Sequence, residues 1–153
     1  MIAAEIYRTS TYGLRHPLRI PRLSTVVDLT RALGWLPADR YITSPRARAS
    51  TLEAWHTPEY LAALQTAERD GGVSDEVRAR HGLGTVSNPV FPEMFRRPAT
   101  AAGASILAGQ LLKEPGVIYS PASGTHHGLP DRANGFCYLN DPVFAILSLR
   151  ASG

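Results

Sequence analysis

Some segments of the chain are short apolar runs typical of strands, and others carry apolar residues at the spacing of a helix. This pattern predicts strands that alternate with helices. Short apolar runs at 2–7 and 41–42 predict two strands, and the run at 117–119 predicts a third, buried strand. Apolar residues at helical spacing predict helices over 24–34, 57–71, 98–112 and 141–150. Strands that alternate with helices need crossover connections, so we expect an α/β fold with a parallel sheet.

Capping residues set the expected ends of these helices. Ser24 is the expected N-cap of the first helix, and Thr57 with Pro58 is the expected start of the second. Pro98 is expected to open a third helix, whose small residues would let it lie close against a sheet. Residues 71–92 are rich in glycine, proline and polar residues, so we expect a long loop there.

Composition predicts one domain, residues 1–153, of ordinary globular character. The chain is 44% hydrophobic and 19% charged, and no apolar window approaches the length of a membrane span. The start of the chain has no signal-peptide pattern, so we expect a cytoplasmic protein without a membrane partner. The single cysteine excludes an internal disulfide, and the mild net charge of +3 does not predict nucleic-acid binding.

The candidate chemistry lies in two neighbouring motifs near the C-terminal end of the sequence. The first is Ser-Gly-Thr-His-His-Gly at 123–128, and the second is Gly-Phe-Cys-Tyr-Leu-Asn-Asp at 135–141. The first motif directly follows the predicted strand at 117–119. In open parallel sheets, ligands bind beyond the carboxyl ends of the strands, so this position favours a functional site.

His126 and His127 are candidates for a general base and its neighbour, because imidazole exchanges protons near neutral pH. The alternative is a pair of loop histidines that bond only to backbone or water. Zinc ligation by this pair is less favoured, because no nearby side chain is spaced to complete three or four ligands. His16, His56 and His81 are scattered and are not predicted to be ligands, and His81 is expected in a flexible loop.

The second motif leaves several interpretations open. Gly135 and Phe136 would either line a narrow channel or form a simple turn with a core phenylalanine. Cys137 is favoured as a small buried residue over a nucleophile beside a histidine. Asp141, followed by Pro142, is favoured as a helix N-cap over a group that holds a histidine.

Both motifs resemble the N-terminal part of the histone deacetylase family, which includes acetoin-utilisation deacetylases and acetylpolyamine amidohydrolases. The segment from Ser123 to Asp141 is similar to the family's His-His and Gly-Phe-Cys-Tyr-x-Asn-Asp signature. Weaker similarities occur at 16–22, at 56–61 and at 88–92. The resemblance therefore covers nearly all of the chain.

The resemblance implies an arginase-like α/β fold and hydrolysis of N-acetyl amides of the acetyl-lysine or acetylpolyamine type by a zinc-bound water. It implies that His127 is the general base and that His126 is the neighbouring histidine. It also implies that Gly135 and Phe136 line the substrate channel and that Arg22 lies in an internal cavity that handles the released acetate.

Two departures from the family pattern matter. Ser87 stands where many members carry an aspartate that binds the substrate backbone. The family's zinc ligands, the acids that orient the two histidines, and the catalytic tyrosine all lie downstream of the region that matches this chain. We therefore expect a truncated, N-terminal portion of the fold without metal ligands, which is inactive and marginally folded until the missing C-terminal half joins it.

Two further readings remain open. One is a non-catalytic, deacetylase-like module that binds acyl groups or a partner. The other is a hydrolase that uses Cys137 with His127.

Overall fold

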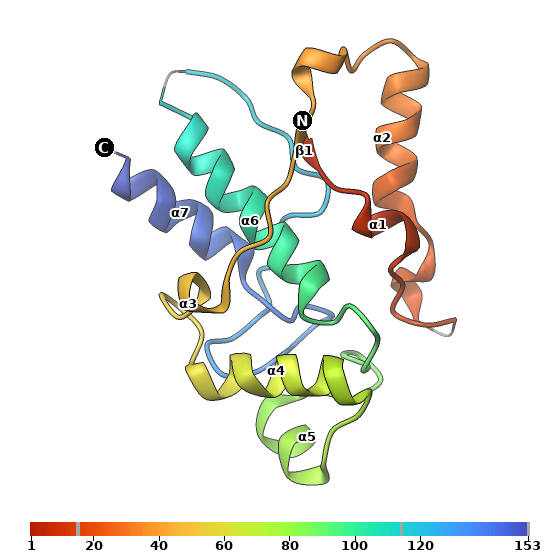
Figure 1. Cartoon of the computed structure of the whole chain (residues 1–153), viewed down its shortest axis with the longest axis vertical. Helices are drawn as coiled ribbons and strands as arrows, with labels where there is room; N and C mark the ends of the chain where they lie inside the picture. Colours follow the sequence, from red (N-terminus) through yellow and green to blue (C-terminus); the bar gives the residue numbers. More distant parts are fainter. Residues whose placement is uncertain (15, 114, 153) are drawn as a thin grey trace.

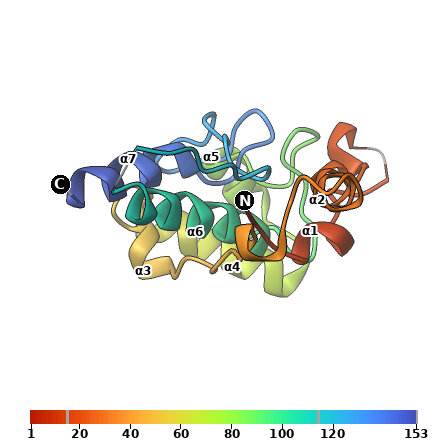
Figure 2. The ribbon, with the colours of Figure 1, turned by 90° about the horizontal axis from the view of Figure 1, so that it is seen from above.

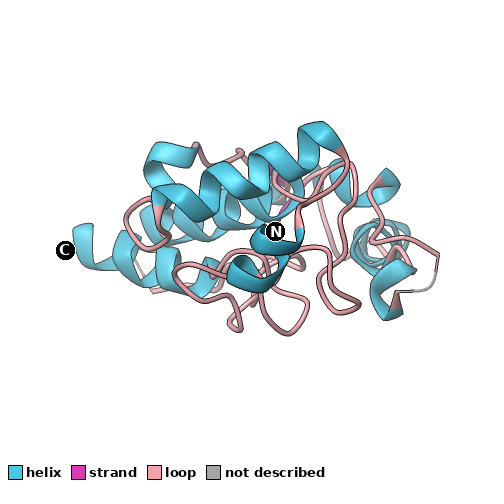
Figure 3. Cartoon of the chain, turned by 90° about the horizontal axis from the view of Figure 1, so that it is seen from below, coloured by secondary structure: helices cyan, strands magenta, loops and turns pink. Residues whose placement is uncertain are grey.

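Helices form one side of the molecule, and long loops gather on the opposite side. The computed structural model of the chain describes residues 1–14, 16–113 and 115–152. The loops at 120–140 lie on the face away from α3 and α4 (Figures 2 and 3). Along the chain the elements are β1 (Ile2–Ala3), α1 (Ile6–Thr9), a 3-10 turn (Pro17–Arg19), α2 (Arg22–Ala32), a second 3-10 turn (Ala38–Arg40), β2 (Ile42–Thr43), α3 (Ala49–Leu52), α4 (Pro58–Asp70), α5 (Asp75–His81), α6 (Arg96–Leu111) and α7 (Asp141–Ala151) (Figure 1).

The sheet is small and parallel, as the sequence predicts. β1 pairs with β2 in parallel, with Ile2 opposite Ile42 and Ala3 opposite Thr43. The Ile2 amide points to the other side of β1 and donates to the Tyr119 carbonyl at 2.9 Å. Successive backbone groups of a strand point to opposite sides, so β1 lies between β2 and the segment that contains Tyr119.

Of the three predicted strands, the first is too long, the second is displaced by one residue to Ile42–Thr43, and the third is wrong. The strand expected over 2–7 ends at Ala3, because Ile6–Thr9 turn into α1 and bury the Tyr7 side chain. Residues 117–119 form no strand ladder and are not buried: Val117 is 96% exposed and Tyr119 is 51% exposed. A hydrogen bond to β1 holds the segment, while Val117 stays almost fully exposed and Ile118 is only half-buried.

The helix α4 forms as its capping residues predict. The Thr57 side chain accepts a hydrogen bond from the Tyr60 amide, Pro58 occupies the first turn, and Gly71 ends the helix at φ +69°. Tyr60, Leu61 and Leu64 lie on its buried face. This face contributes to a core cluster that also includes Leu52, Ala67, Leu83, Phe91, Met94, Phe95, Ala99, Ala102, Tyr138, Leu139 and Phe144.

Two other helices begin earlier than predicted, and one helix was not predicted. α2 begins at Arg22, so Ser24 lies inside it and donates its hydroxyl to the Pro21 carbonyl instead of capping the helix. α6 begins at Arg96, two residues before Pro98. Within the expected loop over 71–92, α5 forms because the Ser74 side chain caps it and Gly82 ends it at φ +66°.

The small residues of α6 allow close packing against two neighbours. α6 and α7 lie side by side through the middle of the molecule (Figure 1). A β-carbon on Gly109 would lie 2.7 Å from the Ser148 β-carbon, and one on Gly103 would lie 2.0 Å from the Pro45 carbonyl oxygen. These close neighbours of α6 are a helix and the extended segment after β2, and α6 also contacts β1 of the sheet, as the sequence had suggested.

In the described part of the chain, no helix combines the length and the apolar character that crossing a bilayer requires.

We expect Gly103→Ala to lower the free energy of unfolding by more than about 2 kcal/mol, although alanine favours helix by about 1 kcal/mol. The reason is that its β-carbon would overlap the Pro45 carbonyl. Urea unfolding measures the difference. Gly72→Ala is the matched control, because no atom lies within 4 Å of a β-carbon there. Equal effects of the two substitutions would contradict the packing.

Candidate functional site

The two sequence motifs form a loop layer that leads into α7. Residues 121–140 carry both motifs, and Asp141 is the first residue of α7. The layer lies over α6 and α7 on the loop-rich face (Figure 2). The structure thus brings the motifs together on one face of the molecule.

The Asp141 carboxylate is the anchor of this layer. It is 1% exposed and accepts hydrogen bonds from the Gly124 amide at 3.0 Å, the Thr125 amide at 2.7 Å and the Ser105 hydroxyl at 2.6 Å. The Thr125 hydroxyl bonds to the same carboxylate. The N-cap position of α7 belongs to Asn140, whose side chain makes no capping bond. The predicted capping role of Asp141 is therefore wrong, because its side chain turns back to hold the loop before the histidines.

His126 and His127 are adjacent, exposed and in ring contact. Their ring centroids lie 4.2 Å apart with an interplanar angle of 40°. His126 Nδ1 lies 3.0 Å from the Gly124 carbonyl oxygen. A carbonyl can only accept, so Nδ1 carries the proton and Nε2 of neutral His126 is free to accept another.

His127 rests against a tight turn. Asn134 and Cys137 exchange backbone hydrogen bonds of 3.0 and 2.8 Å, and both central residues have positive φ: +52° at Gly135 and +70° at Phe136. These values are typical of a type I′ turn. A β-carbon on Gly135 would lie 3.0 Å from His127 Cγ, so glycine is required both by the backbone and by the ring.

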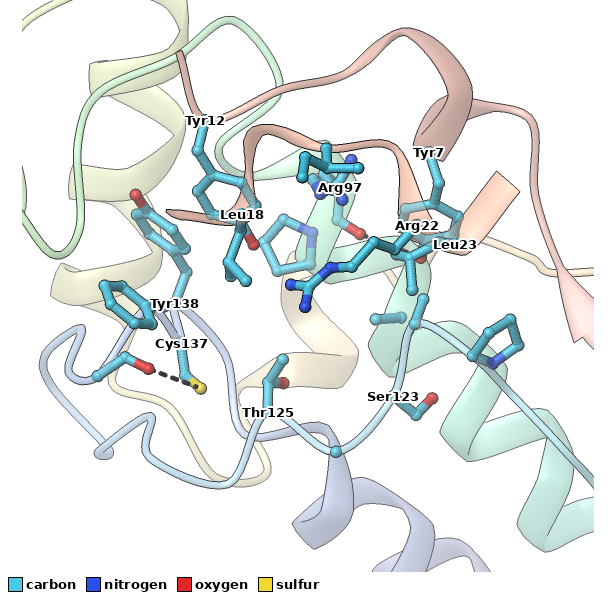
Figure 4. A pocket seen from close by; sticks show the side chains of 18 residues that line it. Tyr7, Tyr12, Leu18, Arg22, Leu23, Arg97, Ser123, Thr125, Cys137 and Tyr138 are labelled. Carbon is cyan, nitrogen blue, oxygen red and sulfur yellow. Dashed lines mark hydrogen bonds between the residues drawn. The ribbon is translucent and has the colours of Figure 1, made fainter. Parts of the chain in front are cut away.

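A cavity of about 500 Å³ lies beside the turn (Figure 4). Its wall comes from four regions: the N-terminal segment through α2, the start of α6, the loop at 121–125 and the turn at 135–138. Phe136 lines it and meets the His16 ring edge-on at 4.8 Å between centroids. Gly135 and Phe136 thus form a turn and also line a hollow, so the two interpretations of these residues are compatible.

Two arginines contribute to the cavity wall. Arg22 comes from α2 and is exposed, and Arg97 comes from α6 and is only 8% exposed. Arg97 donates from Nη1 to the Ser10 carbonyl at 2.8 Å, and its guanidinium carbon lies 5.0 and 5.2 Å from the Tyr7 and Tyr12 ring centroids (Figure 4). No aspartate or glutamate is among the described residues that line the cavity. The two guanidinium groups are therefore the charged groups of the lining, and the Asp141 carboxylate lies behind Gly124 and Thr125 of the same wall.

The tyrosines and the cysteine of this wall stay protonated at neutral pH. Burial raises the pKa of Tyr7 and of Tyr12, although the nearby Arg97 opposes the shift in both. Burial also raises the pKa of the Cys137 thiol, which is 7% exposed. The prediction of a buried Cys137 is confirmed.

The other histidines are buried and bond to backbone. His16 Nδ1 accepts from the Leu18 amide at 3.0 Å, and His81 Nδ1 lies 2.6 Å from the Asp131 carbonyl. His81 is the last residue of α5 and is 4% exposed, so its predicted place in a flexible loop is wrong. His56 is 1% exposed and contacts the Pro130 carbonyl through Nδ1 at 3.2 Å.

Sequence reasoning missed Arg97 and the anchoring role of Asp141. Arg97 precedes Pro98 at the start of a run of small residues, and only this contrast marks it in the sequence. The contacts of Asp141 with residues 124 and 125 span 17 and 16 positions and have no local signal.

The described residues do not fit a zinc site. A zinc site needs three or four ligands. Within residues 1–14, 16–113 and 115–152, no group of three or more histidine, cysteine, aspartate or glutamate side chains converges to hold a metal ion.

Comparison with known proteins identifies related sequences over nearly the whole chain. Residues 16–153 match the family model of the histone deacetylase domain. Histone deacetylase 8 of Danio rerio is 36% identical over 131 residues, which cover 84% of this chain and 34% of that protein. The acetoin utilization protein AcuC of Bacillus subtilis (strain 168) is 28% identical over 147 residues, which cover 95% of this chain and 38% of that protein.

The comparison with solved structures identifies relatives of the same kind. The crystal structure of an HDAC homolog from Aquifex aeolicus matches with a TM-score of 0.92 and 35% identity, over 99% of this chain and 41% of that one. This match confirms the expected α/β, deacetylase-like fold. The chain spans 34–41% of the length of these relatives.

We expect Asp141→Asn to lower the free energy of unfolding by about 3 kcal/mol. The amide keeps the size of the side chain but turns an NH₂ group toward donors that need an acceptor. Urea unfolding measures the loss. Asp131→Asn, on an exposed side chain of the same loop, should change the value by less than about 0.5 kcal/mol. If the two variants unfold alike, Asp141 is not the anchor.

We expect Cys137 in the folded chain to react with iodoacetamide at pH 8 at least about tenfold more slowly than in urea. Burial raises the pKa of the Cys137 thiol and so lowers its thiolate fraction, and the same burial blocks access of the reagent. Mass spectrometry follows the alkylation. Fast labelling of the folded chain would instead favour the interpretation of Cys137 as a nucleophile.

Proposed function

Because the chain belongs to the histone deacetylase family, we propose that it forms the proton-transfer and acyl-binding part of an enzyme that hydrolyses N-acetyl amides. The expected substrates are acetyl-lysine side chains or acetylated polyamines. The observation that carries the proposal is the exposed His126–His127 pair, whose loop the buried Asp141 and Asn140 hold in place.

In this proposal His127 is the general base. It would take a proton from the attacking water and return it to the leaving amine, and the absence of a side chain at Gly135 leaves room for its ring. His126 stands beside it with Nδ1 tied to Gly124, so its Nε2 can share the proton. Both rings are exposed, so a substrate can reach them.

Phe136 and Gly135 would flank the acyl chain, and Arg22 would meet the released acid in the cavity. The position of Arg97 in the same wall supports this assignment, because a second guanidinium strengthens binding of a carboxylate. Two guanidinium groups in a lining without a carboxylate favour the acetate ion over the amine product.

Zinc is the metal that the family resemblance implies, and the described residues do not fit it. We propose that the ligands, and the C-terminal half of the fold that carries them, lie outside these 153 residues. The exposed apolar segment at 117–119 and the exposed Ile146 and Leu149 of α7 are surfaces that such a half would cover. On its own, the 153-residue chain is then inactive.

One observation favours a second candidate, a non-catalytic module that binds acyl groups. The described residues form the whole wall of the cavity, whereas they hold no zinc site. Such a module would bind acetylated amines without turning them over.

An assay of acetate release tests the proposal. The complete product of the gene is incubated with an acetyl-lysine peptide and with N-acetylputrescine, and zinc content is measured in the same sample. We expect turnover that falls about 10²- to 10⁴-fold in His127→Ala, because general-base catalysis contributes that factor. Asp131→Asn, exposed in the same loop, should retain the rate.

Two results would count against the proposal. Turnover and stoichiometric zinc in the isolated 153-residue chain would show that the described residues suffice. A complete gene product that binds acetylated amines but shows no turnover would favour the binding module.

A further inference from the structure

His56 and Tyr60 approach the histidine loop from the far side and belong to no part of the proposed reaction. Tyr60 donates its hydroxyl to the Tyr138 carbonyl at 2.6 Å. His56 contacts the loop at two points ten residues apart, the Pro130 carbonyl and the Asn140 amide. The segment before α4 therefore fixes the start and the end of the stretch from 130 to 140.

The two contacts of His56 define its protonation state. Nδ1 lies 3.2 Å from the Pro130 carbonyl, which can only accept, and the Asn140 amide donates to Nε2 at 3.1 Å. Nδ1 must therefore carry the proton, and Nε2 must be bare. A second proton on Nε2 would face the Asn140 N–H and break that bond.

Asn140 connects His56 to the backbone around His126 and His127. Its side-chain amide donates to the His126 carbonyl at 3.2 Å and to the Gly128 carbonyl at 2.9 Å. These carbonyls stand on both sides of His127. The backbone of His127 is thus held by Asn140, whose own backbone is held by His56.

The surroundings of His56 favour the neutral form. The side chain is packed against the Tyr60 and Phe144 rings, with centroids 5.6 and 5.9 Å away, and is 1% exposed. Tyr60 is the titratable group that faces it, and burial holds the pKa of Tyr60 well above its usual value, so it stays neutral. No carboxylate of the described residues forms an ion pair with His56.

We propose that neutral His56 is a positioning residue, which through Asn140 holds the backbone of His126, His127 and Gly128 in register for proton transfer. Its effect on turnover rests on the proposed function. Its effect on the loop does not, and can be measured in the chain without any reaction.

Protonation of His56 should release the loop in acid. Burial lowers the pKa of His56 below its ordinary value of 6.5. The unfolded or released state therefore binds the proton more readily, so the contribution to stability is complete above about pH 6.5 and is lost as the pH falls below that value.

His81 offers a matched control. It is also buried, and its Nδ1 also meets a loop carbonyl, at Asp131. The structure shows no side-chain contact from His81 to residues 126–128 or to Asn140 among the described residues. Replacing His81 should destabilise the loop around Asp131 and leave the positions of His126 and His127 unchanged.

The experiment is histidine-detected NMR together with amide hydrogen exchange on the 153-residue chain. In the wild type we expect His56 as the Nδ1–H tautomer, neutral at pH 6. His56→Phe should speed exchange of the Asn140 amide about 10- to 100-fold and shift both His126 and His127 ring signals, since one lost buried hydrogen bond changes an equilibrium by that factor. His81→Phe should change neither.

A conservative variant isolates the Nε2 contact. The carbonyl oxygen of glutamine in His56→Gln can accept from the Asn140 amide but cannot titrate. We expect this variant to retain protection of Asn140. We also expect it to lack the loss of protection, measured relative to the intrinsic exchange rate at each pH, that we expect in the wild type between pH 7 and pH 5. If His56→Phe fails to fold, the wild-type tautomer and His56→Gln still decide the matter.

Three results would overturn the proposal. The first is an Nε2–H tautomer or a cationic His56 at pH 6. The second is that the ring signals of His126 and His127 do not shift in His56→Phe. The third is that the Asn140 amide still loses protection in acid in His56→Gln. In an active gene product, His56→Phe should lower kcat more than it raises KM. Absence of turnover in every sample would contradict the proposed function and leave the NMR result standing.

Discussion

The buried Asp141 carboxylate is the interaction on which the candidate site depends. An ionised group that is 1% exposed must replace its lost water with protein donors, and Asp141 does so with the amides of Gly124 and Thr125 and the hydroxyl of Ser105. These donors come from the loop before the histidines and from α6. A single charge therefore ties α6, α7 and the histidine loop into one unit.

The sequence predicted those parts of the structure that have a local cause. The helix α4 forms where Thr57, Pro58 and Gly71 indicate, and the parallel pairing of β1 with β2 follows from alternating elements. The prediction of a buried strand at 117–119 was wrong because Val117 and Tyr119 remain exposed among the described residues. The composition of the segment cannot show whether other residues cover it. The helix α5 had a local signal in Ser74 and Gly82, but its polar content concealed it.

The candidate site was predictable in location but not in construction. Adjacent histidines between glycines marked the loop, and the structure places them exposed and in ring contact. The anchoring by Asp141, the second arginine at Arg97 and the contacts of His56 are all long-range, and they link residues that one sequence cannot pair. His16, His56 and His81, which were not predicted to be ligands, bond to backbone groups and so support the loops.

The backbone of Phe136 has a consequence for how the cavity assembles. A phenylalanine at φ +70° is unfavourable by about 1–3 kcal/mol and persists only while its surroundings hold it. Local preference therefore opposes this turn until His16 and the rest of the wall are in place. The turn and the cavity wall therefore depend on each other, because the turn presents Phe136 to the wall and the wall holds Phe136 in a backbone conformation that it would not adopt alone.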